Sequence, residues 1–73
     1  MFQIVSGGGA YSAEFTVSDP DQGQIEVGRP YPTGHRMSGW YVVGGTPTPA
    51  LLAAASKEVE RRTGYAAEVF TDY

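Results

Sequence analysis

Apolar and polar residues alternate most regularly over residues 11–18 of the chain. The apolar positions are Tyr11, Ala13, Phe15 and Val17, and the polar positions between them are Ser12, Glu14, Thr16 and Ser18. Successive side chains of a β-strand point to opposite faces of its sheet, so this alternation predicts a strand with one buried face.

A turn and a partner strand follow directly. Pro20 and Gly23 lie in the segment Asp19–Gly23, where proline favours the first central position of a turn and glycine can close a bulged hairpin. Pairing Ser18 with Gln24 of the next strand, residues 24–28, brings the apolar faces together. The pairs expected in this register are Val17 with Ile25 and Phe15 with Val27. The other face then gathers Glu14, Thr16 and Glu26, with Asp19 and Asp21 at the tip.

The rest of the chain predicts two more strands before a helix and one after it. Residues 2–6 and 40–43 are the two earlier strands, and residues 65–73 the last. Alternation in the last strand places Phe70 on its outward side. Residues 29–39, with two prolines and two glycines, form a loop that is long for a compact domain.

The helix is bounded by recognisable end signals. Thr48 is the expected N-cap, Pro49 the first helical residue and Gly64 the stop after about Thr63. The order β-β-β-β-α-β predicts an α+β fold, in which the helix packs on one face of an antiparallel sheet of four to five strands.

Length and composition restrict the class of protein. Seventy-three residues predict a single domain, and the absence of cysteine excludes disulfides and thiolate metal sites. The sequence shows no signal peptide and no apolar run long enough to span a membrane, so we expect a cytoplasmic protein that does not engage membranes. We expect no cofactor.

Charge is distributed unevenly along a chain whose net charge is −3. Residues 1–28 contain four carboxylates and no Lys or Arg. This argues against direct nucleic-acid binding, which depends on clustered basic residues, and favours a protein partner with a basic surface.

The residues expected to bind that partner are Glu14, Asp19, Asp21, Glu26, Tyr31, Trp40 and Tyr41. For the aromatic residues we expect one of Trp40 and Tyr41 to point outward, because neighbouring strand residues face opposite sides. A purely solubilising role for the carboxylates stays open.

The sequence offers one candidate site for acid–base catalysis. His35 and Arg36 could act together with Glu14 or Glu26 in a small nuclease or hydrolase, although no spacing rule connects them and they also suit a solvated loop. Ser38 near His35 does not define a triad. A metal site is not expected with one histidine and no cysteine, and the glycine runs at 7–9 and 44–45 lack the Lys of a phosphate loop.

In size, acidity and lack of cysteine the chain resembles small phage-encoded inhibitors of the anti-CRISPR type. This resemblance covers overall character, and it implies a non-enzymatic protein that occupies and inhibits a larger, nucleic-acid-targeting complex. We therefore expect a binding protein. The hydrolase and a structural subunit that forms homo-oligomers through a strand edge remain alternatives.

Overall fold

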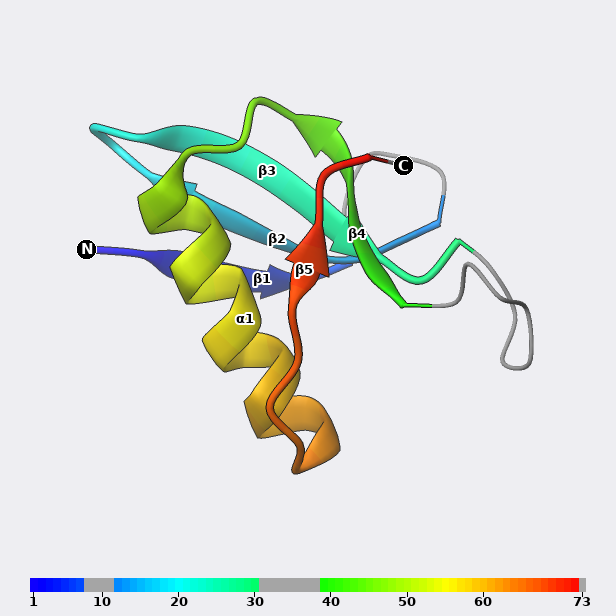
Figure 1. Cartoon of the computed structure of the whole chain (residues 1–73). Coiled ribbons are helices and arrows are strands. Elements are labelled where there is room, and N and C mark those ends of the chain that lie inside the picture. Colours follow the sequence, from blue (N-terminus) through cyan, green and yellow to red (C-terminus); the bar gives the residue numbers. More distant parts are fainter. Residues whose placement is uncertain (8–11, 31–38, 73) are drawn as a thin grey trace.

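The computed structural model describes residues 1–7, 12–30 and 39–72, so Tyr31, His35, Arg36 and Ser38 lie outside the described residues. A four-stranded meander is followed by a helix and a short strand (Figure 1). The elements are β1 (Gln3–Ser6), β2 (Ala13–Asp19), β3 (Gly23–Gly28), β4 (Trp40–Gly45), α1 (Pro49–Thr63) and β5 (Val69–Phe70). The predicted α+β fold is confirmed.

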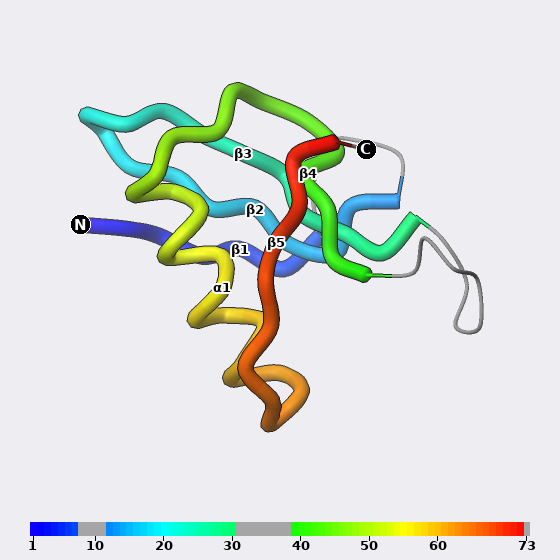
Figure 2. The backbone as a smooth tube through the Cα atoms, viewed as in Figure 1, coloured from blue at the N-terminus to red at the C-terminus, as the bar shows by residue number. Residues whose placement is uncertain are grey.

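The five strands form one sheet in the order β1-β2-β3-β4-β5. The first four are antiparallel neighbours, but β5 pairs with β4 in parallel, so a fully antiparallel sheet is wrong at this edge. The reason is the connection: α1 and the segment after it return the chain to the starting end of β4, as a crossover helix does between parallel strands (Figure 2). The predicted strand over residues 65–73 is confined to Val69 and Phe70.

The register predicted for the β2–β3 hairpin is confirmed. Ser18 pairs with Gln24, and the apolar pairs Val17 with Ile25 and Phe15 with Val27 follow. One departure is a bulge between Ala13 and Phe15, which leaves Glu14 without a direct partner across the hairpin. A second bulge interrupts the β3–β4 register, where Glu26 pairs with Gly44 and Val27 with Val42.

The hydrophobic core lies between α1 and one face of the sheet (Figure 1). Its fully buried members are Phe15, Val17, Ile25, Val27, Leu51, Ala55 and Val59, and Trp40, Val42 and Val69 complete it. We call the other side of the sheet the open face, because α1 does not cover it. Apolar side chains of β2 and β3 recur at every second residue, whereas those of α1 recur at three- or four-residue spacing, so each element presents one apolar face to the other.

The predicted helix boundaries are also confirmed. Thr48 has extended backbone angles, and its Oγ1 accepts a hydrogen bond of 3.2 Å from the backbone N–H of Leu51. Gly64 ends the helix in the left-handed conformation, at φ 83°, and its N–H donates to the carbonyl oxygen of Glu60. Within the described ranges a membrane-spanning helix is absent, since the 15 residues of α1 fall short of the roughly 20 apolar residues required.

Candidate binding surface

The four carboxylates predicted to bind a partner all lie on the β2–β3 hairpin, but they do not form one cluster. Asp19 and Asp21 lie at the tip, while Glu14 is at the far end of β2, five residues and roughly 16 Å away along the strand. Glu26 is between them on the open face, opposite Thr16. The hairpin is therefore acidic along its length rather than at one point.

Asp19 organises the tip of the hairpin. Its Oδ2 accepts hydrogen bonds from the backbone N–H groups of Asp21 (2.9 Å) and Gln22 (3.0 Å), which fixes the turn. Its Oδ1 accepts a bond of 2.9 Å from the amino group of Met1. The amino group, followed by the two backbone donors, lowers the pKa of the Asp19 carboxyl below its ordinary value. Asp19 thus has a structural role in holding the turn and the start of β1.

Glu14 is paired within the chain. The Nε of Arg29 donates to its Oε2 at 3.0 Å, and the guanidinium of Arg29 also lies 4.9 Å from the centre of the Trp40 ring. Arginine suits this position because its flat cation can stack on an aromatic ring and hydrogen-bond a carboxylate at once. The negative charge of Glu14 is partly balanced by Arg29 of the same chain. Glu14 is therefore a weaker candidate for binding a partner than the sequence suggested.

A hollow of about 340 Å³ opens beside the hairpin tip. Gln3, Ser18 and Gln24 occupy neighbouring positions on β1, β2 and β3, since Gln3 pairs with Ser18 and Ser18 with Gln24. The complete lining is Met1, Gln3, Ser18, Asp19, Pro20, Gly23 and Gln24. Amide, hydroxyl and carboxylate groups thus share the lining with Met1 and Pro20 at the acidic end of the open face, and exposed Asp21 follows on the adjoining turn.

The expectation that Trp40 or Tyr41 points into solvent is wrong. Both are buried, with exposed fractions of 8% and 5%. Trp40 faces the core and lies 5.9 Å, ring to ring, from Phe15. Tyr41 faces the opposite side, where the ring of Phe70 lies 5.4 Å away. The alternation was right, but β5 supplies an aromatic cover that the sequence of β4 does not reveal.

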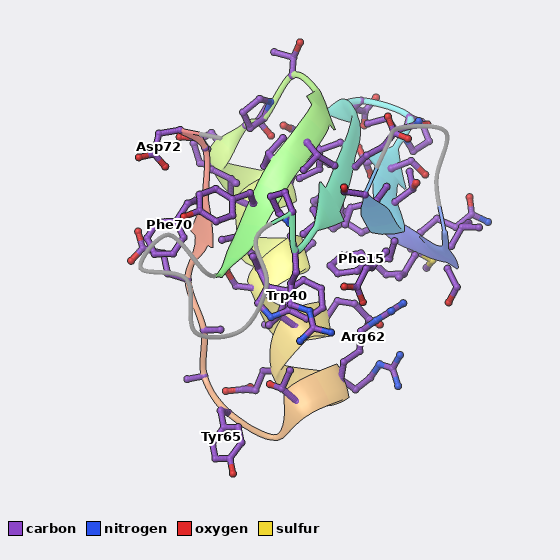
Figure 3. All side chains as sticks on the ribbon, turned by 90° about the vertical axis from the view of Figure 1, so that its right-hand side faces the viewer. Phe15, Trp40, Arg62, Tyr65, Phe70 and Asp72 are labelled. Carbon is purple, nitrogen blue, oxygen red and sulfur yellow. The ribbon has the colours of Figure 1, made fainter. Side chains whose placement is uncertain are left out.

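The exposed aromatic residues in the described structure are Tyr65 and Phe70 near the C-terminal end of the chain and Phe2 before β1. Phe70 is 38% exposed on the open-face side of β5, as its alternation predicted, and Tyr65 is 77% exposed in the turn after α1 (Figure 3). Phe70 and Tyr41 lie at the β4–β5 side of the sheet, whereas the strand residues that line the hollow come from β1, β2 and β3. Phe70 and Tyr65 are therefore separate from the acidic hairpin tip, whereas exposed Phe2 lies in the chain between Met1 and Gln3, which line the hollow.

A charged cluster that was not predicted from the sequence lies at the end of α1. Glu58 is only 6% exposed and accepts two hydrogen bonds from Arg61, at 2.9 and 2.6 Å, and one of 2.6 Å from Arg62. Hydrogen bonding to Arg61 is the main cause that lowers the pKa of Glu58 to about 2, against the opposing effect of burial. The three- and four-residue spacings were the signal for this cluster.

Arg62 connects this cluster to the sheet. Its Nη2 donates to the hydroxyl of Ser6 at 3.2 Å, and its guanidinium lies 4.6 Å from the centre of the Phe15 ring (Figure 3). The cluster has every buried polar atom satisfied in the described residues. We therefore assign it a structural role, joining the end of α1 to β1 and β2.

The described residues add no new candidate for a metal site to those considered from the sequence. Among residues 1–7, 12–30 and 39–72, no three His, Cys, Asp or Glu side chains converge to hold a metal ion. The N-terminus of α1, which follows Gly44 and Gly45, is capped by Thr48, whose hydroxyl also donates to Gln22 at 2.9 Å. Comparisons with protein-family models, curated proteins and solved structures gave no match.

Proposed function

We propose that this protein is a non-enzymatic binding protein that occupies a basic surface of a larger protein and thereby inhibits it. The observation that carries the proposal is the hollow between Gln3 and Gln24 at the hairpin tip, which Asp19 helps to line and beside which Asp21 is exposed. Its volume of about 340 Å³ is roughly ten times the 30 Å³ or so of a water molecule, which leaves room for a lysine or arginine side chain from a partner.

The chemistry of the hairpin suits such a partner. Asp21 is exposed at the tip, and Glu26 continues negative charge along the open face. Carboxylates arranged in this way attract a basic surface from a distance and speed its encounter. The neighbouring amides and hydroxyl can then hydrogen-bond the cationic group, which adds specificity to long-range attraction. The inhibitory part of the proposal rests on the resemblance to small phage-encoded anti-CRISPR inhibitors, which would make the partner a nucleic-acid-targeting complex.

Affinity capture with charge-reversed baits tests the proposal. Wild-type protein, immobilised and exposed at low salt to a lysate of its source cell, should retain a basic protein that elutes as the salt concentration rises. The reason is that exposed charge contacts are screened over about 8–10 Å at physiological ionic strength. Asp21→Lys should weaken retention at least tenfold. Glu60→Lys is the matched control, since it makes the same change of charge on an exposed residue of α1. Equal retention by the two variants would contradict a binding site at the hairpin tip.

Inhibition needs a second measurement. Once the captured partner is identified, its activity should fall as wild-type protein is added and should fall with the control variant in the same way. Asp21→Lys should require at least ten times more protein for the same effect. If the partner binds without losing activity, the result would support the proposed binding function and contradict the proposed inhibition.

A further inference from the structure

The outer edge of β1 lacks the features that usually prevent one sheet from pairing with another. Edge strands are commonly protected by charged residues, proline, a bulge or very short length. From Phe2 to Ser6 the chain has neither charge nor proline, and the β1–β2 register runs without a bulge. The opposite edge is protected, because β5 has only two residues and lies between Glu68 and Asp72.

Apolar side chains are exposed along this same edge. Of the five large exposed hydrophobic residues in the described structure, Met1, Phe2 and Val5 lie on or directly before β1. Phe2 is 40% exposed and Val5 is 55% exposed. Alternation along the strand directs Phe2 and Val5 to opposite faces of the sheet, so this edge carries exposed apolar surface on both faces, and such surface commonly marks an interaction site.

The helix leaves this edge accessible. Viewed from the right of Figure 1, β1 lies at the side of the sheet away from β5, and α1 lies nearer the middle (Figure 3). In the described residues β1 has one neighbouring strand, β2. The backbone groups on its outer side are therefore available to a further strand.

We propose that β1 binds the β1 strand of a second copy of this chain, joining two sheets into one. This goes beyond the proposed function and does not depend on it. Antiparallel pairing of two identical strands places a twofold axis perpendicular to the sheet, so one residue must lie opposite its own copy. Centring the pair on Ile4 aligns all of residues 2–6 with residues 6–2 of the second copy.

This register suits the side chains on both faces. Ile4 pairs with Ile4 of the second copy on the side that carries α1, and Val5 pairs with Gln3 on the open face. Phe2 falls opposite Ser6, where it reaches the guanidinium of Arg62, a cation that already stacks on an aromatic ring. Because residues 2–6 are uncharged, self-pairing opposes no like charges within the strand, which favours a second copy as the occupant.

Sedimentation equilibrium over roughly 1 µM to 1 mM tests the association, a range chosen because a short strand pair gives a small interface and weak, reversible binding. The wild type should change from monomer to dimer across it. Val5→Lys should raise the dissociation constant at least about fivefold by placing a charge on the edge. The control Gln24→Lys, which adds the same charge to exposed β3, should change it less than twofold. A monomer throughout the range, or equal effects of the two variants, would overturn the proposal.

Cross-linking tests the register without depending on the stability of Val5→Lys. The chain has no cysteine, so a single introduced thiol reports one position. Ile4→Cys should form a disulfide-linked dimer at least about five times faster than Val5→Cys, because directly opposed Cβ atoms approach to about 4.5–5.5 Å and diagonal ones do not. Equal or reversed rates would overturn the pairing centred on Ile4. Asp21→Lys, which tests the hairpin tip, should leave dimerisation unchanged, so failure of one proposal is distinguishable from failure of the other.

Discussion

Replacing Glu58 by glutamine should destabilise the protein in a way that depends on pH. The substitution keeps the shape of the side chain and removes the charge that Arg61 and Arg62 neutralise. Two guanidinium groups then meet an uncharged amide in a largely buried place. The destabilisation should be greatest near neutral pH and should disappear in acid.

The magnitude follows from the pKa of Glu58. Burial alone would raise this pKa, but hydrogen bonds from Arg61 and then Arg62 lower it from 4.5 to about 2. At 1.36 kcal/mol for each pKa unit, this corresponds to an upper value of roughly 3 kcal/mol. The side chain of Arg61 is 70% exposed, so water and salt screen part of the attraction, and we expect Glu58→Gln to cost about 1–2 kcal/mol at pH 7.

The direction of the pH dependence follows from the lowered pKa. A carboxyl whose pKa is lower in the folded state than in the unfolded chain contributes its full stability above the unfolded pKa, here about 4.5. That contribution is lost as pH falls from 4.5 through the folded pKa of about 2. The gap in unfolding free energy between wild type and variant should therefore be constant above about pH 5.5 and narrow below pH 4.5.

Urea unfolding at several pH values between 7 and 2.5 measures this gap. Far-ultraviolet circular dichroism gives the midpoint and slope at each pH, and an unchanged slope shows that the unfolded states are comparable. The pKa of Asp19 is lowered too, but its contribution is common to both proteins and cancels in the difference. Glu60→Gln is the control, because Glu60 is exposed on the same helix.

Parallel pH curves would refute the reasoning. If Glu58→Gln and the wild type lost stability in step between pH 5.5 and 2.5, the ion pairs with Arg61 and Arg62 would make no net contribution. A difference at pH 7 no larger than that of Glu60→Gln would lead to the same conclusion.

Three other substitutions test separate parts of the fold by urea unfolding. Thr48→Ala removes the oxygen that caps α1 and should cost about 1 kcal/mol, whereas Thr48→Ser should cost little. Gly45→Ala should cost at least about 2 kcal/mol, because Gly45 has φ 84° and a Cβ there would overlap the carbonyl oxygen of Gln24; a loss below about 0.5 kcal/mol would contradict this. Phe70→Ala should cost about 1–2 kcal/mol and weaken the near-ultraviolet signal of Tyr41, and a Phe70→Leu variant should retain more than half of that stability.

The parts of the fold that the sequence predicted correctly are those determined by neighbouring residues. The β2–β3 register follows from two alternating segments on either side of one turn, and the ends of α1 follow from Thr48, Pro49 and Gly64. These features depend on local backbone preferences and on matching one apolar face to another. No distant part of the chain is needed to specify them.

The errors arose where distant segments meet. The parallel pairing of β5 depends on the path that the chain takes after α1, and the burial of Tyr41 depends on Phe70, 29 positions later. The bulge at Glu14 similarly separates this carboxylate from the regular pattern and brings it to Arg29. The candidate site was therefore predicted as a set of acidic residues on a hairpin, while its hollow, which needs Gln3 from β1, could not be anticipated.

The shortness of β5 has a consequence for the order in which the molecule can assemble during synthesis. Val69 contacts the core beside Trp40, and Phe70 covers Tyr41 on the other side of β4, so two consecutive residues complete both layers around that strand. A growing chain that has made the hairpin, β4 and α1 can already pack Trp40 against Phe15, but it still lacks the aromatic cover of Tyr41. Completion of the fold therefore waits for Val69 and Phe70, which are synthesised after α1, and until then the partly made chain exposes an aromatic surface on β4 that favours aggregation.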